Sequence, residues 1–142
     1  LAAILDLYSR KVVGWSISRQ IDRRLTLGAL QQALRERQPP AGCLHHSDRG
    51  VQYACGDYIA MLNDQKLRPS MSRSGNPYDN AAAESFMKTL KYEEVYLGGY
   101  ETYEDVLSRL PYFIEELYNK KRLHSSLGYM PPDEFERQFE GE

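Results

Sequence analysis

The chain has 142 residues, of which 42% are hydrophobic and 27% charged, a balance that fits one folded domain and excludes a disordered chain. No apolar run approaches the ~18 residues that a membrane span needs, and two cysteines are too few for a disulfide scaffold, so we expect a cytoplasmic protein. The net charge of −2 does not by itself indicate a nucleic-acid binder, but basic residues cluster locally, at 10–11, within 19–24, at 88 and 91, and at 120–122.

The first half of the chain predicts alternating strands and helices. Apolar or β-branched runs bounded by short polar breaks predict strands, and apolar residues at helical spacing predict helices. The predicted elements are, in order, strand 1–8, strand 11–18, helix 25–38, strand 43–46 ending at Ser47-Asp48, helix 54–65 and strand 67–72. The short break between the first two strands makes them an antiparallel hairpin.

The second half of the chain predicts helices. Asn80 can cap a helix that runs through Glu84 toward Tyr96. Thr102 and Asp105 form a capping-box-like start for a last long helix.

Two prolines and the order of the elements complete the fold prediction. Pro111 lies inside the last long helix, where we expect a kink or a break. Pro131-Pro132 opens a short terminal turn or helix. The order of elements predicts one α/β domain over residues 1–142, with a mixed sheet flanked by helices and a C-terminal helical extension from about residue 102.

Asp48 directly follows a predicted strand. Ligands collect at the carboxyl ends of strands in open α/β sheets, and a carboxylate there suits a hard cation such as Mg²⁺. The alternative is that Asp48 only caps the turn before Arg49-Gly50, and its position taken alone favours this cap.

Glu84 lies on a predicted helix with Lys88 and Lys91 at i+4 and i+7, which places all three on one face. Phe86 and Leu90 fall on the opposite face and suit the core. The alternative is a solvent-exposed helix with an ordinary Glu-to-Lys pair, and the helix taken alone favours it.

Four longer segments change this balance, namely LDLYSRKVVGW at 5–15, HHSDRGVQY at 45–53, SMSRSGNPYDNAAAESFMKTLK at 70–91 and YNKKRLHSSLGYMPP at 118–132. In this order they resemble the integrase-like core of bacterial insertion-sequence transposases, in the insertion-sequence-three family, whose catalytic subunit is similar to retroviral integrase. The resemblance covers essentially the whole chain and implies a ribonuclease-H-like fold.

The resemblance also implies a site. Asp48 and Glu84 match the second and third members of an Asp-Asp-Glu metal triad, with 35 residues between them. Two Mg²⁺ (or Mn²⁺) ions are the expected cofactors. Lys88 and Lys91 would meet DNA phosphates near the cut end. Further candidate DNA contacts are Arg73, Asn80 and Arg122.

By the same resemblance, the first triad aspartate precedes the strand of residues 1–8. We therefore expect it, and the first central strand, to lie upstream of Leu1. Asp6 is the tempting substitute, but it stands in the DLYSR segment, for which the resemblance implies no metal role, so we expect it to serve the hairpin. Residues 1–142 alone are then expected to be inactive, and marginally stable or associated through exposed strand edges.

The implied function is metal-dependent DNA cleavage and strand transfer at insertion-sequence ends. The expected partners are the terminal repeats, target DNA and further copies of the chain on paired ends, in the nucleoid and away from membranes. One alternative is a catalytically inactive remnant, or a DNA-binding or assembly module, of a decayed transposase. Another is a ribonuclease H of the same fold, against which the Glu84 helix and the terminal motif argue.

Histidines leave two further alternatives. His45-His46 invites a zinc site, but adjacent strand residues point to opposite faces and no metal-binding spacing accompanies them, so we favour a structural role. His124, like Arg122, fits either a DNA contact or packing at a helix end.

Overall fold

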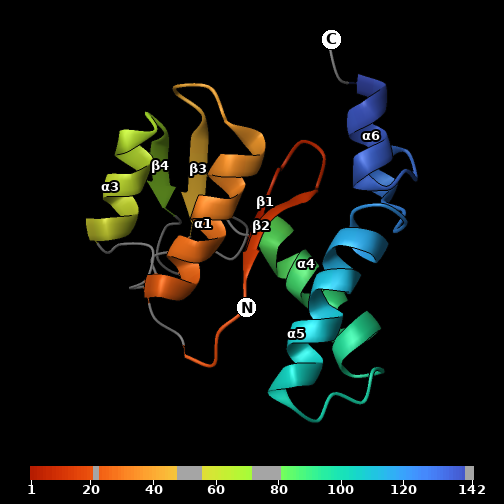
Figure 1. The fold of residues 1–142 in the computed structure, drawn as a ribbon. Helices are drawn as coiled ribbons and strands as arrows, with labels where there is room; N and C mark the ends of the chain where they lie inside the picture. Colours follow the sequence, from red (N-terminus) through yellow and green to blue (C-terminus); the bar gives the residue numbers. More distant parts are fainter. Residues whose placement is uncertain (21–22, 48–55, 72–80, 140–142) are drawn as a thin grey trace. The chain divides into compact units, whose positions relative to one another are not determined.

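The computed structural model describes residues 1–20, 23–47, 56–71 and 81–139 (Figure 1). They form two compact units, one of Leu1–Ile4 with Val13–Glu84 and one of Leu5–Val12 with Ser85–Glu142. No described helix is both long enough and apolar enough to cross a membrane.

Two small sheets form the strands of the protein. β1 (Ala2–Leu5) pairs with β2 (Val12–Ser16), and the six-residue connection makes the pair an antiparallel hairpin, whose turn belongs to the second unit. β3 (Leu44–Ser47) pairs in parallel with β4 (Arg68–Met71), with Leu44 opposite Arg68. The expected mixed sheet is thus divided, within the described residues, into an antiparallel and a parallel pair.

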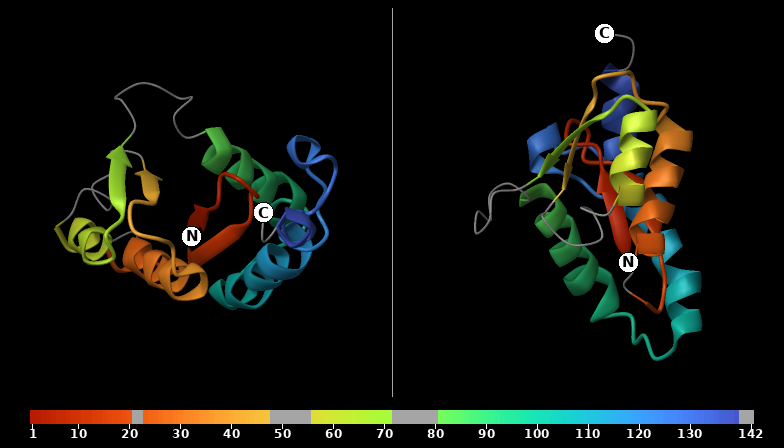
Figure 2. Two further views of the ribbon diagram at one scale, coloured as in Figure 1. Left: turned by 90° about the horizontal axis from the view of Figure 1, so that it is seen from above. Right: turned by 90° about the vertical axis from the view of Figure 1, so that its left-hand side faces the viewer.

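Two helices cover the parallel pair in the first unit. α1 (Arg23–Arg37) and α3 (Gly56–Asp64) lie side by side on the same face of β3 and β4 (Figure 2). The two helices contribute Leu30, Tyr58 and Leu62 to a buried apolar cluster, which Leu67, just before β4, completes. The strand–helix–strand order explains the parallel pairing, because parallel neighbours need a long crossover connection.

The hairpin packs closely against α1. Ala2 of β1 joins Leu25 and Ala29 of α1 in a second buried cluster. A Cβ atom at Gly14 of β2 would collide with the carbonyl oxygen of Ala29, so only glycine allows this approach of the two backbones.

The second unit is helical. Its elements are α4 (Ala81–Leu90), which begins at the end of the first unit, the π-helical η2 (Lys91–Val95), α5 (Tyr103–Tyr112), the π-helical η3 (Phe113–Tyr118), the 3₁₀-helical η4 (Ser125–Leu127) and α6 (Pro132–Phe139). Phe86 and Tyr118 meet edge to face in its core, with ring centroids 4.9 Å apart. Beyond residue 102 the described chain is thus mainly helical, in α5, η3, η4 and α6.

The start of α5 matches its prediction, and the expected break at Pro111 does not occur. The Thr102 hydroxyl accepts from the Asp105 N–H, and the Asp105 carboxylate accepts from the Thr102 N–H, which completes the capping box. The chain stays helical through Pro111, and its hydrogen bonding changes to the π pattern from Phe113. A proline lacks the N–H for one helical bond, and here the helix absorbs that loss without ending.

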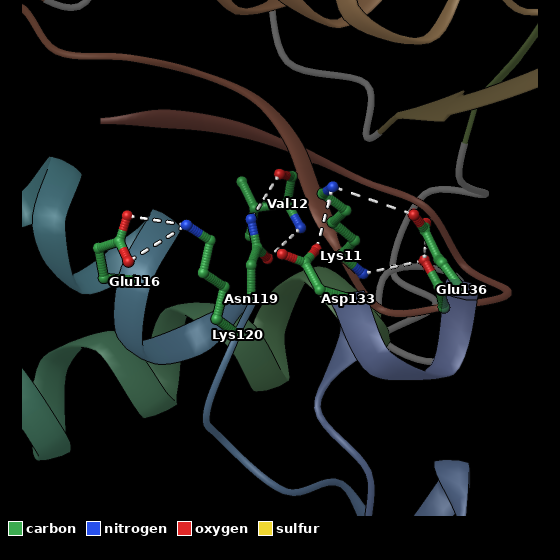
Figure 3. A network of polar contacts seen from close by, with 8 residues as sticks. Lys11, Val12, Glu116, Asn119, Lys120, Asp133 and Glu136 are labelled. Carbon is green, nitrogen blue, oxygen red and sulfur yellow. Dashed lines mark hydrogen bonds and ion pairs between the residues drawn. The ribbon is translucent and has the colours of Figure 1, made fainter. Parts of the chain in front are cut away.

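A buried asparagine joins the C-terminal region to the hairpin. The Asn119 side chain, 4% exposed, accepts from the Val12 N–H at 2.9 Å and donates to the Val12 carbonyl at 3.1 Å (Figure 3). The backbone carbonyl of Asn119 accepts from the N–H of Asp133, in the first turn of α6, at 2.8 Å. Asn119 therefore satisfies backbone groups of two distant segments at once.

Charged side chains of α6 add to this junction. Lys11 lies 3.0 Å from an Asp133 carboxylate oxygen and 3.9 Å from one of Glu136, as Figure 3 shows. The fully buried Ser9 hydroxyl donates to Glu136 at 2.6 Å. The hairpin turn and α6 are thus held together by polar contacts.

Candidate functional site

α4 places Glu84 in its first turn. Three alanines, 81–83, favour helix there, and Phe86 and Leu90 fix the buried side at 1% and 3% exposure. A carboxylate in the first turn also interacts favourably with the positive end of the helix dipole. The prediction of a helix with one buried and one exposed side is confirmed.

Glu84, Lys88 and Lys91 lie on the exposed side of this helix. Spacings of four and seven residues put the three side chains in one row. Within the described residues, none of the three has a hydrogen-bond or ion-pair partner, so the ordinary Glu84–Lys88 pair is not formed there. One carboxylate and two ammonium groups are therefore available to a ligand.

The remaining predicted site residues, Asp48, Arg73 and Asn80, lie outside the described residues. β3 ends at Ser47, the residue before Asp48 in the sequence, which agrees with the predicted end of that strand. The described part of the chain contains no group of three His, Cys, Asp or Glu side chains that could hold a metal ion. Of the expected metal ligands, the structure thus characterises Glu84.

The environment of Glu84 fits one ligand of a hard cation. Carboxylate oxygens are the donors that Mg²⁺ and Mn²⁺ prefer, and these ions usually keep several waters. Glu84 is exposed, which leaves room for such waters, and no described cation neutralises it.

The basic residues of the terminal motif are engaged differently. Arg122 forms a bidentate ion pair with Glu93 of η2, with Nε at 3.0 Å and Nη2 at 2.8 Å from the same carboxylate oxygen. The hydrogen bonds that the Arg122 guanidinium donates to Glu93 raise the pKa of Arg122. Lys120 pairs with Glu116 one helical turn away, at 3.0 Å. A DNA contact by Arg122 stays a prediction, and it would compete with Glu93.

The two strand histidines have separate hydroxyl partners. His45 Nε2 lies 2.8 Å from the Tyr58 hydroxyl, and His46 Nδ1 lies 3.0 Å from the Ser70 hydroxyl. Burial, followed by the neighbouring His46, lowers the pKa of His45. These partners support the structural role that we favoured over a zinc site.

His124 packs in the second unit. Its ring meets Tyr118 edge to face at 5.1 Å, and its buried Nε2 has no hydrogen-bond partner among the described atoms. Burial, and then the positive charges of Arg122 and Arg10, lower the pKa of His124. This environment supports packing at the helix end.

Asp6 serves the hairpin, as predicted. Its carboxylate accepts from the N–H groups of Tyr8 and Ser9, at 2.8 and 3.3 Å. Its backbone N–H donates to the Lys11 carbonyl, and its carbonyl accepts from the Arg10 N–H. Asp6 thereby shapes the turn between β1 and β2.

Two tyrosines on the same helix escaped the sequence analysis. Tyr92 and Tyr96 of the η2 region are 61% and 63% exposed, and their rings meet edge to face with centroids 5.3 Å apart. Their spacing of four residues, continuing the row from Glu84 through Lys88, was the signal that could have revealed them.

Comparisons with known proteins agree with these features. Two family profiles, both described as integrase core domain, match residues 1–77 and 65–132. The transposase for insertion sequence element IS904 of Lactococcus lactis is 42% identical over 137 residues, which cover 96% of this chain and 54% of that protein. The transposase InsF for insertion sequence IS3fB of Escherichia coli is 42% identical over 138 residues, covering 97% and 48%.

A solved structure supports the fold. The catalytic core domain of BIV integrase superposes with a TM-score of 0.61 at 21% identity, covering 94% of this chain and 82% of that chain. The described helices and small sheets are therefore those of a ribonuclease-H-like integrase core, which confirms the predicted fold class. The chain spans about half the length of the curated relatives that it matches. It belongs to the integrase core domain family, and the curated relatives that it matches are named as transposases of insertion sequences.

Proposed function

We propose that this chain forms part of the catalytic core of a transposase that cleaves DNA and transfers strands at the ends of an insertion sequence. The observation that carries the proposal is the exposed row of Glu84, Lys88 and Lys91, which lacks partners among the described residues. The transposase names of the relatives and the integrase core fold support it.

Glu84 and Asp48 would hold divalent cations, Mg²⁺ or Mn²⁺, and two such ions stabilise charge on the attacking and leaving oxygens of a phosphodiester. The protein's own residues bind and orient the DNA. Lys88 and Lys91, one and two turns beyond Glu84, bind phosphates beside the reacting bond. Positioning of the DNA strand is the main catalytic task, because the reaction asks for little covalent chemistry from the protein.

The substrates we propose are the terminal repeats of the element and a target DNA. An insertion sequence has two ends, and each end must be cleaved and joined to the target DNA. A complex that processes both ends together therefore requires more than one active site. We therefore propose a homo-oligomer assembled on paired ends.

The test is a strand-transfer assay on the natural protein that carries this chain. Glu84→Gln and Asp48→Asn keep the shape of each side chain but remove its charge, and each should abolish strand transfer while DNA binding persists. Glu104→Gln, the same change at an exposed glutamate in the first turn of α5, is the matched control and should keep full activity. Activity retained in either site variant would reject the assignment.

The unsubstituted protein also distinguishes the alternative function. If it binds terminal-repeat DNA and assembles on it without cleaving it in Mg²⁺ or Mn²⁺, the chain is a binding or assembly module rather than an enzyme core.

A further inference from the structure

The row that begins at Glu84 continues beyond the lysines into aromatic residues. Four exposed side chains of α4, η2 and the C-cap of η2 form what we call the Lys–Tyr face, namely Lys88, Lys91, Tyr92 and Tyr96. At Lys91 the helix changes to π geometry, with the Tyr96 N–H donating to the Lys91 carbonyl at 2.9 Å. Such π turns recur at functional sites.

Tyr92 and Tyr96 do not contribute to the core of the protein. More than half of each side chain is exposed, at 61% and 63%, although tyrosine rings bury well. The edge-to-face contact between Tyr92 and Tyr96, with an interplanar angle of 88°, holds the rings in a defined arrangement. Ring surface that is both ordered and open to solvent can accept a stacking partner at a small entropic cost.

The charges around the tyrosines determine what that partner is. The acids of η2 already have partners within the chain. Glu93 pairs with Arg122, and Glu94 accepts from the Tyr100 hydroxyl and lies 3.7 Å from Arg109. Lys88 and Lys91 have no such partners among the described residues. The Lys–Tyr face thus offers uncompensated positive charge beside aromatic rings.

This combination distinguishes nucleic acid from a second protein. Protein–protein interfaces are enriched in tyrosine but depleted in lysine. Nucleic-acid grooves combine cations that follow the phosphates with aromatic rings that stack on bases. Bases within a duplex are already stacked on each other, so free rings can stack only on bases that are unpaired.

We propose that the Lys–Tyr face binds DNA with unpaired bases, in which Tyr92 and Tyr96 stack on bases while Lys88 and Lys91 contact the phosphates. The inference rests on the proposed function, since it names the form of DNA that lies next to the Glu84 site. Unpaired nucleotides at a cut or opened DNA end are the substrate feature that this face recognises.

The test compares affinities for a short single-stranded DNA and a duplex of the same length, measured by fluorescence anisotropy on the chain. Tyr92→Leu/Tyr96→Leu should weaken single-strand binding about tenfold or more, because aromatic stacking is lost. Duplex binding and its salt dependence should stay unchanged. Tyr92→Phe/Tyr96→Phe keeps both rings and should bind as the unsubstituted chain does.

A matched control is Tyr112→Leu, which removes an equally exposed tyrosine (56%) from α5 and should change neither affinity. Unaltered single-strand binding by the double leucine variant, or an equal loss on both DNAs, would overturn the inference. Loss of self-association in sedimentation with unchanged DNA affinity would also overturn it, in favour of a contact between copies of the chain. Thermal unfolding of each variant shows that these surface changes leave the fold intact.

The outcome is separable from that of the proposed function. Single-strand binding that depends on the tyrosines, in a protein without strand-transfer activity, would keep this inference and reject the enzyme. Strand transfer that depends on Glu84, with binding indifferent to the tyrosines, would do the reverse.

Discussion

The chain has two short basic clusters, Lys88 with Lys91 on α4 and η2 and residues 120–122 in the terminal motif, and their side chains have different surroundings. Lys88 and Lys91 lack partners among the described residues, whereas Lys120 and Arg122 each face a carboxylate. The hairpin residue Lys11 is likewise held by α6. Clusters that look alike as sequence thus divide into charges available to a ligand and charges that stabilise the fold.

This difference teaches that local charge density is a weak guide to DNA binding. An arginine that already forms a bidentate ion pair must break that pair before it can bind a phosphate. An unpaired lysine on an exposed helix loses only hydration and side-chain freedom. The following predictions test how far this division holds.

The largest effect is expected for the buried junction of the terminal region. Asn119→Ala leaves the N–H and carbonyl of Val12 without partners and opens a cavity, which should lower the free energy of unfolding by about 3 kcal/mol. Urea unfolding measures this change. Asn63→Ala, at an exposed asparagine, is the control and should have little effect. An unchanged midpoint for Asn119→Ala would show that the terminal region does not stabilise the fold.

The next effect concerns the unpaired lysines. Lys88→Gln/Lys91→Gln should weaken duplex binding about 10- to 100-fold at low salt, and should reduce the slope of log affinity against log salt by about two. The paired residues supply the comparison, since Lys120→Gln/Arg122→Gln removes the same formal charge. If both double variants reduce the slope equally, the paired residues bind DNA as well as the unpaired lysines do, and the proposed difference between the two clusters is wrong.

A smaller effect is expected from His124. Its folded-state pKa lies below the ordinary value of about 6.5, because burial and then Arg122 and Arg10 oppose its charge. As the pH falls through about 6.5, the unfolded chain takes up a proton that the folded chain does not, so stability decreases until the folded pKa is reached.

His124→Gln should therefore flatten the decline of unfolding free energy between about pH 7 and 5. It should not remove the decline entirely, since burial also lowers the pKa of His45. Urea unfolding at a series of pH values measures both curves, and parallel curves would contradict the assignment.

The smallest effect is expected for the ion pair between Arg122 and Glu93. Both side chains are partly exposed, so Arg122→Gln should lower the free energy of unfolding by less than about 1 kcal/mol. Its effect on duplex affinity should be smaller than that of either lysine. A loss of DNA binding as large as that of Lys88→Gln would place Arg122 in the DNA interface despite its partner.

Most elements of the fold could be predicted from sequence because their signals are local. Apolar spacing gave α1 and α3, and the Thr102–Asp105 pattern gave the start of α5. The division of the sheet could not be predicted in this way, since strand pairing depends on contacts between distant segments. The persistence of helix through Pro111 is likewise a tertiary effect, because Leu110, Phe113 and Ile114 are buried around it.

The candidate site was predictable in part. The helical spacing of Glu84, Lys88 and Lys91 was enough to place them on one exposed side. The partner of Arg122 was not predictable, because Glu93 lies 29 residues earlier and the two meet only through the fold. Tyr92 and Tyr96 were missed because tyrosines at helical spacing usually indicate a core.

The hydrogen bonds between Asn119 and Val12 also constrain the order in which parts of the protein fold during synthesis. The two residues are 107 positions apart, so the hairpin cannot gain this partner while the ribosome is still translating the residues between them. At a synthesis rate of about 5–20 residues per second, Asn119 is made on the order of ten seconds after the turn of the hairpin. During that interval the first unit can build its apolar core around α1 and α3, and the second unit closes last.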